Sequence, residues 1–141
     1  MQHDPAVQFA FSDSCAIDAQ GASIWASYKT YYATVAAGAL VRTEIFDGSD
    51  FVARFLSVKN LILNVSAVVW RREALLAAIA ACGDDVGGLK VAGDWRLYLQ
   101  ALAVQGAEVA YCAEPLNTHR RHASSVTHVL NSEKHLDEIA A

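Results

Sequence analysis

The chain of 141 residues has few charged residues, few cysteines and no long apolar run, and each of these absences disfavours a common class of protein. Only 18% of its residues are charged, and the formal net charge is −4. That balance disfavours a protein whose main task is to bind nucleic acid or an anionic membrane through charge. No apolar run reaches the roughly 18 residues that a membrane-spanning helix needs. We therefore expect no nucleic-acid partner and no membrane span in this segment.

Cysteine is also scarce, and this excludes two further classes. Cys15, Cys82 and Cys112 lie far apart, are odd in number and form no CxxC pair. The pattern therefore indicates neither a zinc knuckle nor a disulfide framework, and we expect buried free thiols in a reducing compartment. The first residues, "MQHDPAVQFAF", lack a basic stretch followed by an apolar one, which predicts no secretory signal.

The residues that are present suit a single folded domain spanning 1–141. Hydrophobic residues make up 54% of the chain, which is enough to fill a core, and no repeat, low-complexity tract or linker divides it. The hydrophobic pattern predicts three strands and several helices. We expect strands at 7–11, 64–70 and 107–116, a partly helical stretch at 23–42, and helices at 50–58, 71–82, 94–104 and 129–141.

Turns and a proline are expected to mark the ends of two strands. A polar turn at "SDS", residues 12–14, ends the first strand, and Asp13 and Asp18 flank a turn. Pro115 ends the pairing of the last strand, and a polar loop follows it from 117 to 128. Strands that alternate with helices predict an α/β layer structure. No glycine-rich nucleotide loop is visible, so the chain looks like the back half of a larger α/β enzyme.

Four segments, taken in order, resemble the C-terminal half of a family 2 glycosyltransferase, an inverting enzyme with the GT-A fold. They are "FAFSDSCAIDAQG" (9–21), "NVSAVVWRREAL" (64–75), "AGDWRLYLQALAVQG" (92–106) and "VAYCAEPLNTHRRHASSVT" (109–127). They are similar to the family's strand with an acidic turn, its acceptor-side strand and helix, its Glu-Asp-aromatic helix start, and its "R.H..S" tail. The resemblance covers roughly residues 7 to 128.

The resemblance implies a fold, and it implies that the N-terminal half of that fold is missing from this segment. The fold would be α/β, the C-terminal portion of a GT-A nucleotide-sugar transferase, with a small mixed sheet flanked by helices. The N-terminal nucleotide-binding half and its Asp-x-Asp metal motif would lie upstream of Met1. The segment alone would then be inactive, and surfaces exposed by the missing half would favour a homodimer.

The resemblance also implies a function for the full-length protein. It would move a sugar, with inversion, from a nucleotide-sugar donor to a glycan, lipid or other hydroxyl acceptor. A divalent metal, Mg²⁺ or Mn²⁺, would be required, with most of its ligands upstream and none assigned here. Such a bacterial enzyme would work in the cytoplasm or at the inner face of the membrane.

Asp94 is the candidate catalytic base, because it falls on the aspartate of the family's Glu-Asp pair. A carboxylate at a helix N-terminus is stabilised by the helix dipole and by free N–H groups, which would hold it ionised and in place. The alternative is a helix-capping aspartate with no further role. Gly93 stands where the family usually has glutamate, so a second carboxylate is absent.

Five further residues are candidates for substrate binding. Trp95 would line the acceptor site or anchor its helix in the core. Asn64 and Ser66 begin the segment that resembles the acceptor-side wall. Arg121 and His122 match the "R.H" tail near the donor diphosphate, where arginine suits phosphate through paired hydrogen bonds. A solvated basic loop is the alternative for these last two.

Two other classes of function stay open at this point. The chain would be a small non-catalytic α/β binding or assembly module if Asp94 only caps its helix. A metal-dependent hydrolase would follow if His119 and His122 of "HRRH" bound a metal, although no acidic or thiol ligand is nearby in sequence. Asp13 and Asp18 would form a turn or lie near the donor.

Overall fold

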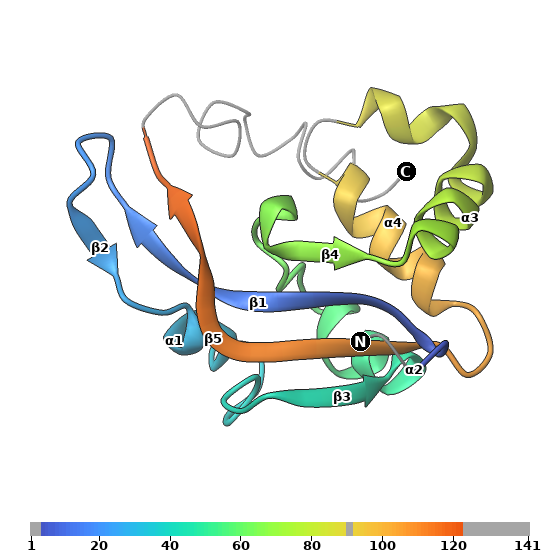
Figure 1. The fold of residues 1–141 in the computed structure, drawn as a ribbon, viewed down its shortest axis with the longest axis horizontal. Coiled ribbons are helices and arrows are strands. Elements are labelled where there is room, and N and C mark those ends of the chain that lie inside the picture. The colour runs from blue at the N-terminus through green and yellow to red at the C-terminus, as the bar shows by residue number, and fades with distance from the viewer. Residues whose placement is uncertain (1–3, 90–91, 123–141) are drawn as a thin grey trace.

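The computed structural model describes residues 4–89 and 92–122, which form one curled mixed sheet with helices packed on it (Figure 1). The predicted α/β class is therefore confirmed. The predicted terminal helix at 129–141 lies outside the described residues, as does His128 in the predicted loop. No helix in the described ranges is long and apolar enough to cross a bilayer.

Two long parallel strands form the centre of the sheet: β1 (Val7–Ile17) and β5 (Glu108–Arg120). β4 (Val68–Trp70) pairs antiparallel with the first part of β1, and β2 (Ser23–Trp25) pairs with its end. β3 (Glu44–Asp47) pairs antiparallel with the first part of β5. The far ends of β1 and β5 bend away from the rest of the sheet together with β2 (Figure 1).

The helices are short except for two. α3 (Arg72–Cys82) and α4 (Gly93–Leu102) pack side by side near the end of the sheet where β1 begins (Figure 1). α1 (Lys29–Tyr32) follows β2, and α2 (Gly48–Phe51) continues directly into the π-helix η1 (Val52–Leu56). α3 and α4 agree with the predicted ranges to within about two residues, which is the usual uncertainty of helix ends.

The turn predicted at 12–14 is wrong, because β1 runs straight through it. Val7, Phe9 and Phe11 face the core, and Asp13 takes the next core-facing position on the strand. Asp13 is 0% exposed, and its carboxylate accepts hydrogen bonds instead of ending the strand. The turn comes after the strand, where Asp18 Oδ1 accepts the N–H groups of Gln20 and Ala22.

Pro115 does not end the pairing of β5, which continues to Arg120. The register of β1 and β5 shifts on both sides of Asp13, so that Asp13 lies opposite Pro115 and Ser14 lies opposite Asn117. A proline lacks the N–H that a regular ladder uses, and a register irregularity of this kind accommodates it. Residues 117–120, predicted as loop, are therefore strand.

Two further segments differ from the expectation. The stretch 23–42 contains the short strand β2 and only four helical residues, α1. The strand predicted at 64–70 begins with a 3-10 helix, η2 (Val65–Ala67), and only β4 is extended. The Asn64 side chain accepts the N–H of Ser66 at 3.2 Å and so stabilises a turn at this point.

Aromatic side chains fill the core between the sheet and the helices. Phe9 lies against Trp70 and Tyr98, with ring centroids 4.8 and 5.3 Å away, and Phe51 packs edge-on against Phe55 at 5.1 Å. All three cysteines are free thiols, of which only Cys82 is buried. Phe11, on the same face of β1 as Phe9, packs edge-on against Phe51 at 5.8 Å, so neighbouring rings join the sheet both to α4 and to α2 and η1.

Gly48 marks the closest approach between α2 and the chain that enters β5. Its N–H donates to the carbonyl of Ala107 at 2.7 Å. A Cβ atom at this position would lie 2.8 Å from the same backbone oxygen and 3.2 Å from a methyl group of Leu102. The backbone cannot yield as a flexible side chain would, so this position requires glycine.

Gly48→Ala is expected to lower the free energy of unfolding by about 1–3 kcal/mol, the usual cost of overpacking, although alanine is the better helix former. Gly87→Ala is the matched control, since a Cβ there meets nothing within 4 Å. Urea denaturation followed by circular dichroism measures both. An unchanged midpoint for Gly48→Ala would show that the contact is loose.

Candidate functional site

Asp94 lies in the first turn of α4, half-buried, and is not the N-cap residue. The N-cap is Ala92, which makes no side-chain cap hydrogen bond. Asp94 Oδ1 accepts the N–H of Trp95 at 2.7 Å and lies 3.5 Å from Nδ2 of Asn60. Its other oxygen, Oδ2, has no hydrogen-bond partner among the described residues. The carboxylate is therefore held through one oxygen while the other remains available.

Burial raises the pKa of Asp94 above its ordinary value, and the hydrogen bonds to its carboxylate offset this only in part. Tyr98, one helical turn further on, is buried below it, and its hydroxyl has no partner within the described residues. Burial, and then the charge of Asp94, raises the pKa of Tyr98. An aspartate desolvated in this way is a stronger base than one in water.

Trp95 is half-buried and packs against the core. Its indole Nε1–H donates to the carbonyl of Leu56 at 3.1 Å, at the end of η1. Asn60, four residues after Leu56, contacts Asp94. Asp94 and Trp95, in the first turn of α4, therefore both contact the same segment, 56–60, which the sequence did not single out as part of a site.

Asn64 and Ser66 belong to a second polar group on the curled part of the sheet. Ser66 Oγ lies 2.6 Å from Asn64 Oδ1 and 3.2 Å from Asn117 Oδ1. Nδ2 of Asn117 donates to Ser14 Oγ at 3.1 Å. The predicted acceptor-side residues are thus joined to β5 and, through Asn117, to Ser14 of β1, the residue that follows the buried Asp13.

Asp13 organises the interior beneath this polar group. Its carboxylate accepts hydrogen bonds from the Ser27 hydroxyl at 2.5 Å, the Tyr28 N–H at 3.1 Å and the Ser14 N–H at 2.8 Å. Burial, and then the negative charge of Asp13, raises the pKa of Tyr32. The carboxylate therefore fastens the start of α1 to the middle of β1.

Arg121 and His122 lie just beyond the far end of β5. The guanidinium of Arg121 covers the ring of Trp25, 4.8 Å from its centroid, and the Arg121 N–H donates to Ile17. His122 is exposed. His119, on the strand itself, has its Nδ1 2.9 Å from the Tyr28 hydroxyl. Burial first, then the charges of Arg121 and His122, lowers the pKa of His119.

The predicted site residues fall into three separate places, and each group contacts its own part of the sheet or of the loops. Asp94 and Trp95 contact segment 56–60, Asn64 and Ser66 contact β5, and Arg121 and His122 follow the end of the same strand. Sequence reasoning missed Asn60, Tyr98 and Asn117. Only Asn117 gave a signal, as a polar residue directly after the "EPL" motif.

Within residues 4–89 and 92–122, no group of three or more His, Cys, Asp or Glu side chains is arranged to hold a metal ion. The expected divalent metal would therefore need ligands from elsewhere. His119 Nδ1 is engaged with the Tyr28 hydroxyl, so the alternative of a metal bound by "HRRH" would have to use Nε2 of His119.

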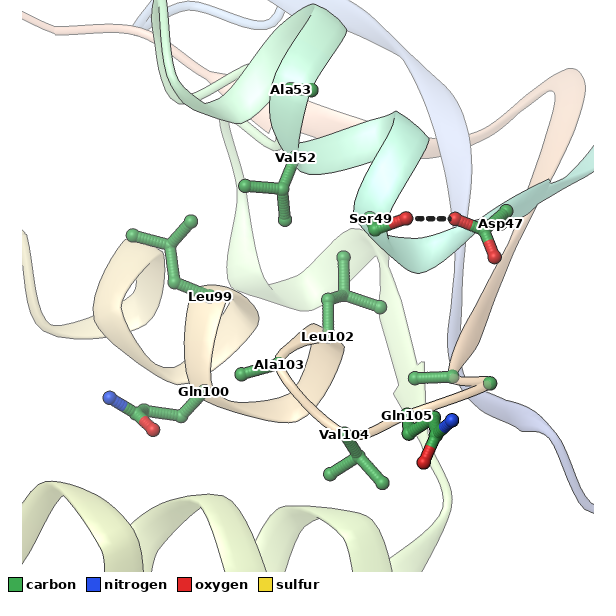
Figure 2. Close-up of a pocket in the computed structure, with 12 residues that line it drawn as sticks. Asp47, Ser49, Val52, Ala53, Leu99, Gln100, Leu102, Ala103, Val104 and Gln105 are labelled. Carbon is green, nitrogen blue, oxygen red and sulfur yellow. Dashed lines mark hydrogen bonds between the residues drawn. The ribbon is translucent and has the colours of Figure 1, made fainter.

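A cavity of about 740 Å³ lies between η1 and the C-terminal end of α4 (Figure 2). Val52, Ala53, Leu99 and Leu102 form its apolar walls, and Asp47 lies at its rim. None of the residues that the sequence singled out lines this cavity. We therefore place the candidate chemistry at the other end of α4, around Asp94.

Comparison of the chain with family models, with curated proteins and with solved structures gives no match.

Asp13→Asn is expected to lower the free energy of unfolding by about 1–3 kcal/mol, because an amide offers one acceptor oxygen where the carboxylate offers two. Asp18→Asn is the control, since asparagine forms the same turn, and its effect should stay within about 0.5 kcal/mol. Chemical denaturation of both variants measures the difference. Equal effects would show that the buried network is dispensable.

Asp94→Asn is expected to stabilise the protein at neutral pH. A carboxyl whose pKa is raised on folding contributes stability below its unfolded-state pKa, and that contribution is lost as pH rises through the folded value. Asparagine carries no charge, so the free energy of unfolding of the variant does not fall with rising pH for this reason. The gain in melting temperature should vanish below pH 3.8, the ordinary pKa of the group. A variant that is less stable at every pH would mean that the carboxylate serves packing alone.

Proposed function

We propose that this chain is the acceptor-binding, catalytic-base part of an inverting glycosyltransferase with the GT-A fold. The observation that carries the proposal is Asp94: a half-buried carboxylate with a raised pKa, at the start of a core helix, with one oxygen unengaged among the described residues. The four-segment resemblance supplies the reaction class. The mixed α/β sheet is compatible with it.

The reaction would be a single displacement at the anomeric carbon. The acceptor hydroxyl gives its proton to Asp94 Oδ2 as its oxygen forms the new bond to the sugar. The bond from the sugar to the nucleoside diphosphate breaks on the opposite face, so the configuration inverts. A carboxylate base works best when its pKa approaches the working pH, which the burial of Asp94 favours.

The other residues would hold the base and the substrates. The Trp95 N–H and Asn60 fix the carboxylate in one orientation, and the Trp95 ring keeps α4 against η1. Asn64 and Ser66 would contact acceptor hydroxyls. Arg121 and His122 would stabilise negative charge on a phosphate-bearing substrate. A divalent metal would assist the departing diphosphate, but the described residues lack its ligand set, so no step is derived through it.

The decisive measurement compares Asp94→Asn with the wild type in the enzyme that carries this chain together with its nucleotide-binding half. We expect kcat for transfer, followed as released nucleoside diphosphate, to fall by about 10²–10⁴-fold, as is typical for loss of a general base. The melting temperature of the variant is measured at the same pH, which separates a loss of catalysis from a loss of folded protein.

Asp50→Asn is the matched control. Asp50 is likewise the acidic residue in the first turn of a helix, but it is exposed and paired with Arg54 at 2.8 Å. It should leave kcat unchanged. If Asp94→Asn keeps full kcat while remaining folded, Asp94 is not the base and the proposed mechanism fails.

A further inference from the structure

An aromatic–cation strip lies on the far ends of β2 and β5 and continues over α1. It consists of Arg121, Trp25, Tyr28, His119, Tyr31 and Lys59. The guanidinium of Arg121 lies 4.8 Å from the Trp25 centroid, and the ammonium of Lys59 lies 4.2 Å from the Tyr31 centroid. Between these ends, Tyr28 meets Trp25 at 5.3 Å and Tyr31 at 6.3 Å. Contacts between neighbouring side chains therefore connect the whole strip.

The strip is held in place by the interior of the protein. Trp25, Ala16 and His119 face one another across three adjacent strands. The Tyr28 N–H donates to the buried Asp13, and the Tyr28 hydroxyl lies 2.9 Å from His119 Nδ1. A surface fixed in this way loses little conformational entropy when a ligand binds.

The strip carries two cations, Arg121 and Lys59, although the net charge of the chain as a whole is −4. Lys59 is exposed and forms no ion pair within the described residues. The charges of Arg121 and His122 contribute to lowering the pKa of His119. The one described carboxylate that bonds to the strip, Asp13, is completely buried and accepts several hydrogen bonds. The exposed charge favours an anionic ligand.

The arrangement of the rings favours a saccharide over a nucleic acid. Trp25 is 44% exposed and offers a rigid apolar surface, whereas Tyr28, which packs against it, is only 4% exposed and its hydroxyl is engaged with the half-buried His119. Single-stranded nucleic acids bind by stacking successive bases on open ring faces. Here a cation covers one face of Trp25 and of Tyr31, and both rings meet Tyr28 edge-on, at 80° and 89°.

One end of the strip lies close in sequence to a residue that contacts the candidate base. Lys59, its last member, is followed directly by Asn60, whose amide contacts the carboxylate of Asp94. We propose that the aromatic–cation strip binds an anionic oligosaccharide, with carboxylate or phosphate groups, as the acceptor chain. Its role as acceptor depends on the proposed glycosyl transfer, whereas binding itself does not.

The first experiment measures binding to this chain by isothermal titration calorimetry. The probes are hexagalacturonate, a phosphorylated maltohexaose, neutral maltohexaose and a single-stranded DNA hexamer. At least one of the two anionic saccharides should bind about tenfold more tightly than the neutral one, the effect of roughly one charge contact. Which of the two binds more tightly separates carboxylate from phosphate recognition. The bound anion should raise the pKa of His119, followed by NMR.

The second experiment locates the binding. Lys59→Gln should weaken the affinity for the preferred saccharide by about tenfold. Arg54→Gln is the matched control, because Arg54 also lies over an aromatic ring, 4.9 Å from the Phe55 centroid, but outside the strip. The control should bind normally. Four results would overturn the proposal. They are an equal loss of affinity in Lys59→Gln and Arg54→Gln, an equal affinity for the neutral and the anionic saccharides, a higher affinity for the DNA hexamer than for any saccharide, and no binding of any saccharide.

The two proposals fail separately. If the strip binds the saccharide but transfer is unaffected by Asp94→Asn, the glycosyltransferase mechanism fails and a saccharide-binding module remains. If Asp94→Asn abolishes transfer but Lys59→Gln changes neither binding nor the KM for the acceptor, the strip is not the acceptor site and the mechanism stands.

Discussion

A single buried carboxylate determines how the curled half of the molecule is built. Asp13 occupies a core-facing position on β1, where an unsatisfied charge would be costly. It is satisfied by the hydroxyl of Ser27 and by the N–H of Tyr28, at the entrance to α1. The positions of Tyr28, and through it of His119, follow from these bonds. The polar surface above the sheet therefore depends on a group that no ligand reaches.

Asp94 illustrates the opposite arrangement, in which a carboxylate is incompletely satisfied. Its burial is compensated by one short hydrogen bond, from Trp95, and one long contact, with Asn60. The resulting rise in pKa costs stability at neutral pH and increases basicity. Asp13 thus serves the fold and Asp94 carries the features of a reactive group, although sequence alone placed both beside turns or helix ends.

Local sequence patterns predicted the helices whose start and end are set by neighbouring residues. The spacing of Ala and Leu and the stop at Gly83 predicted α3, and the run behind Asp94 predicted α4. The path of β1 could not be predicted, because three polar residues usually form a turn. Here their central carboxylate is satisfied by groups fourteen and fifteen positions away. The contact between Asn60 and Asp94, 34 positions apart, is equally invisible to local patterns.

The outer edge of β5 has a consequence for the protein's solubility. Beyond the last pair with β3, the N–H of Ala113 already donates to the Thr43 hydroxyl at 3.1 Å, and Pro115 has no N–H to offer. If a strand from another copy of the chain paired with β5 beyond the end of β3, it could accept a hydrogen bond neither from the Ala113 N–H, which is already used, nor from Pro115, which has none. Exposed edges of this kind are common starting points for aggregation. One side chain and one ring thus protect this edge in the described part of the chain without an additional covering element.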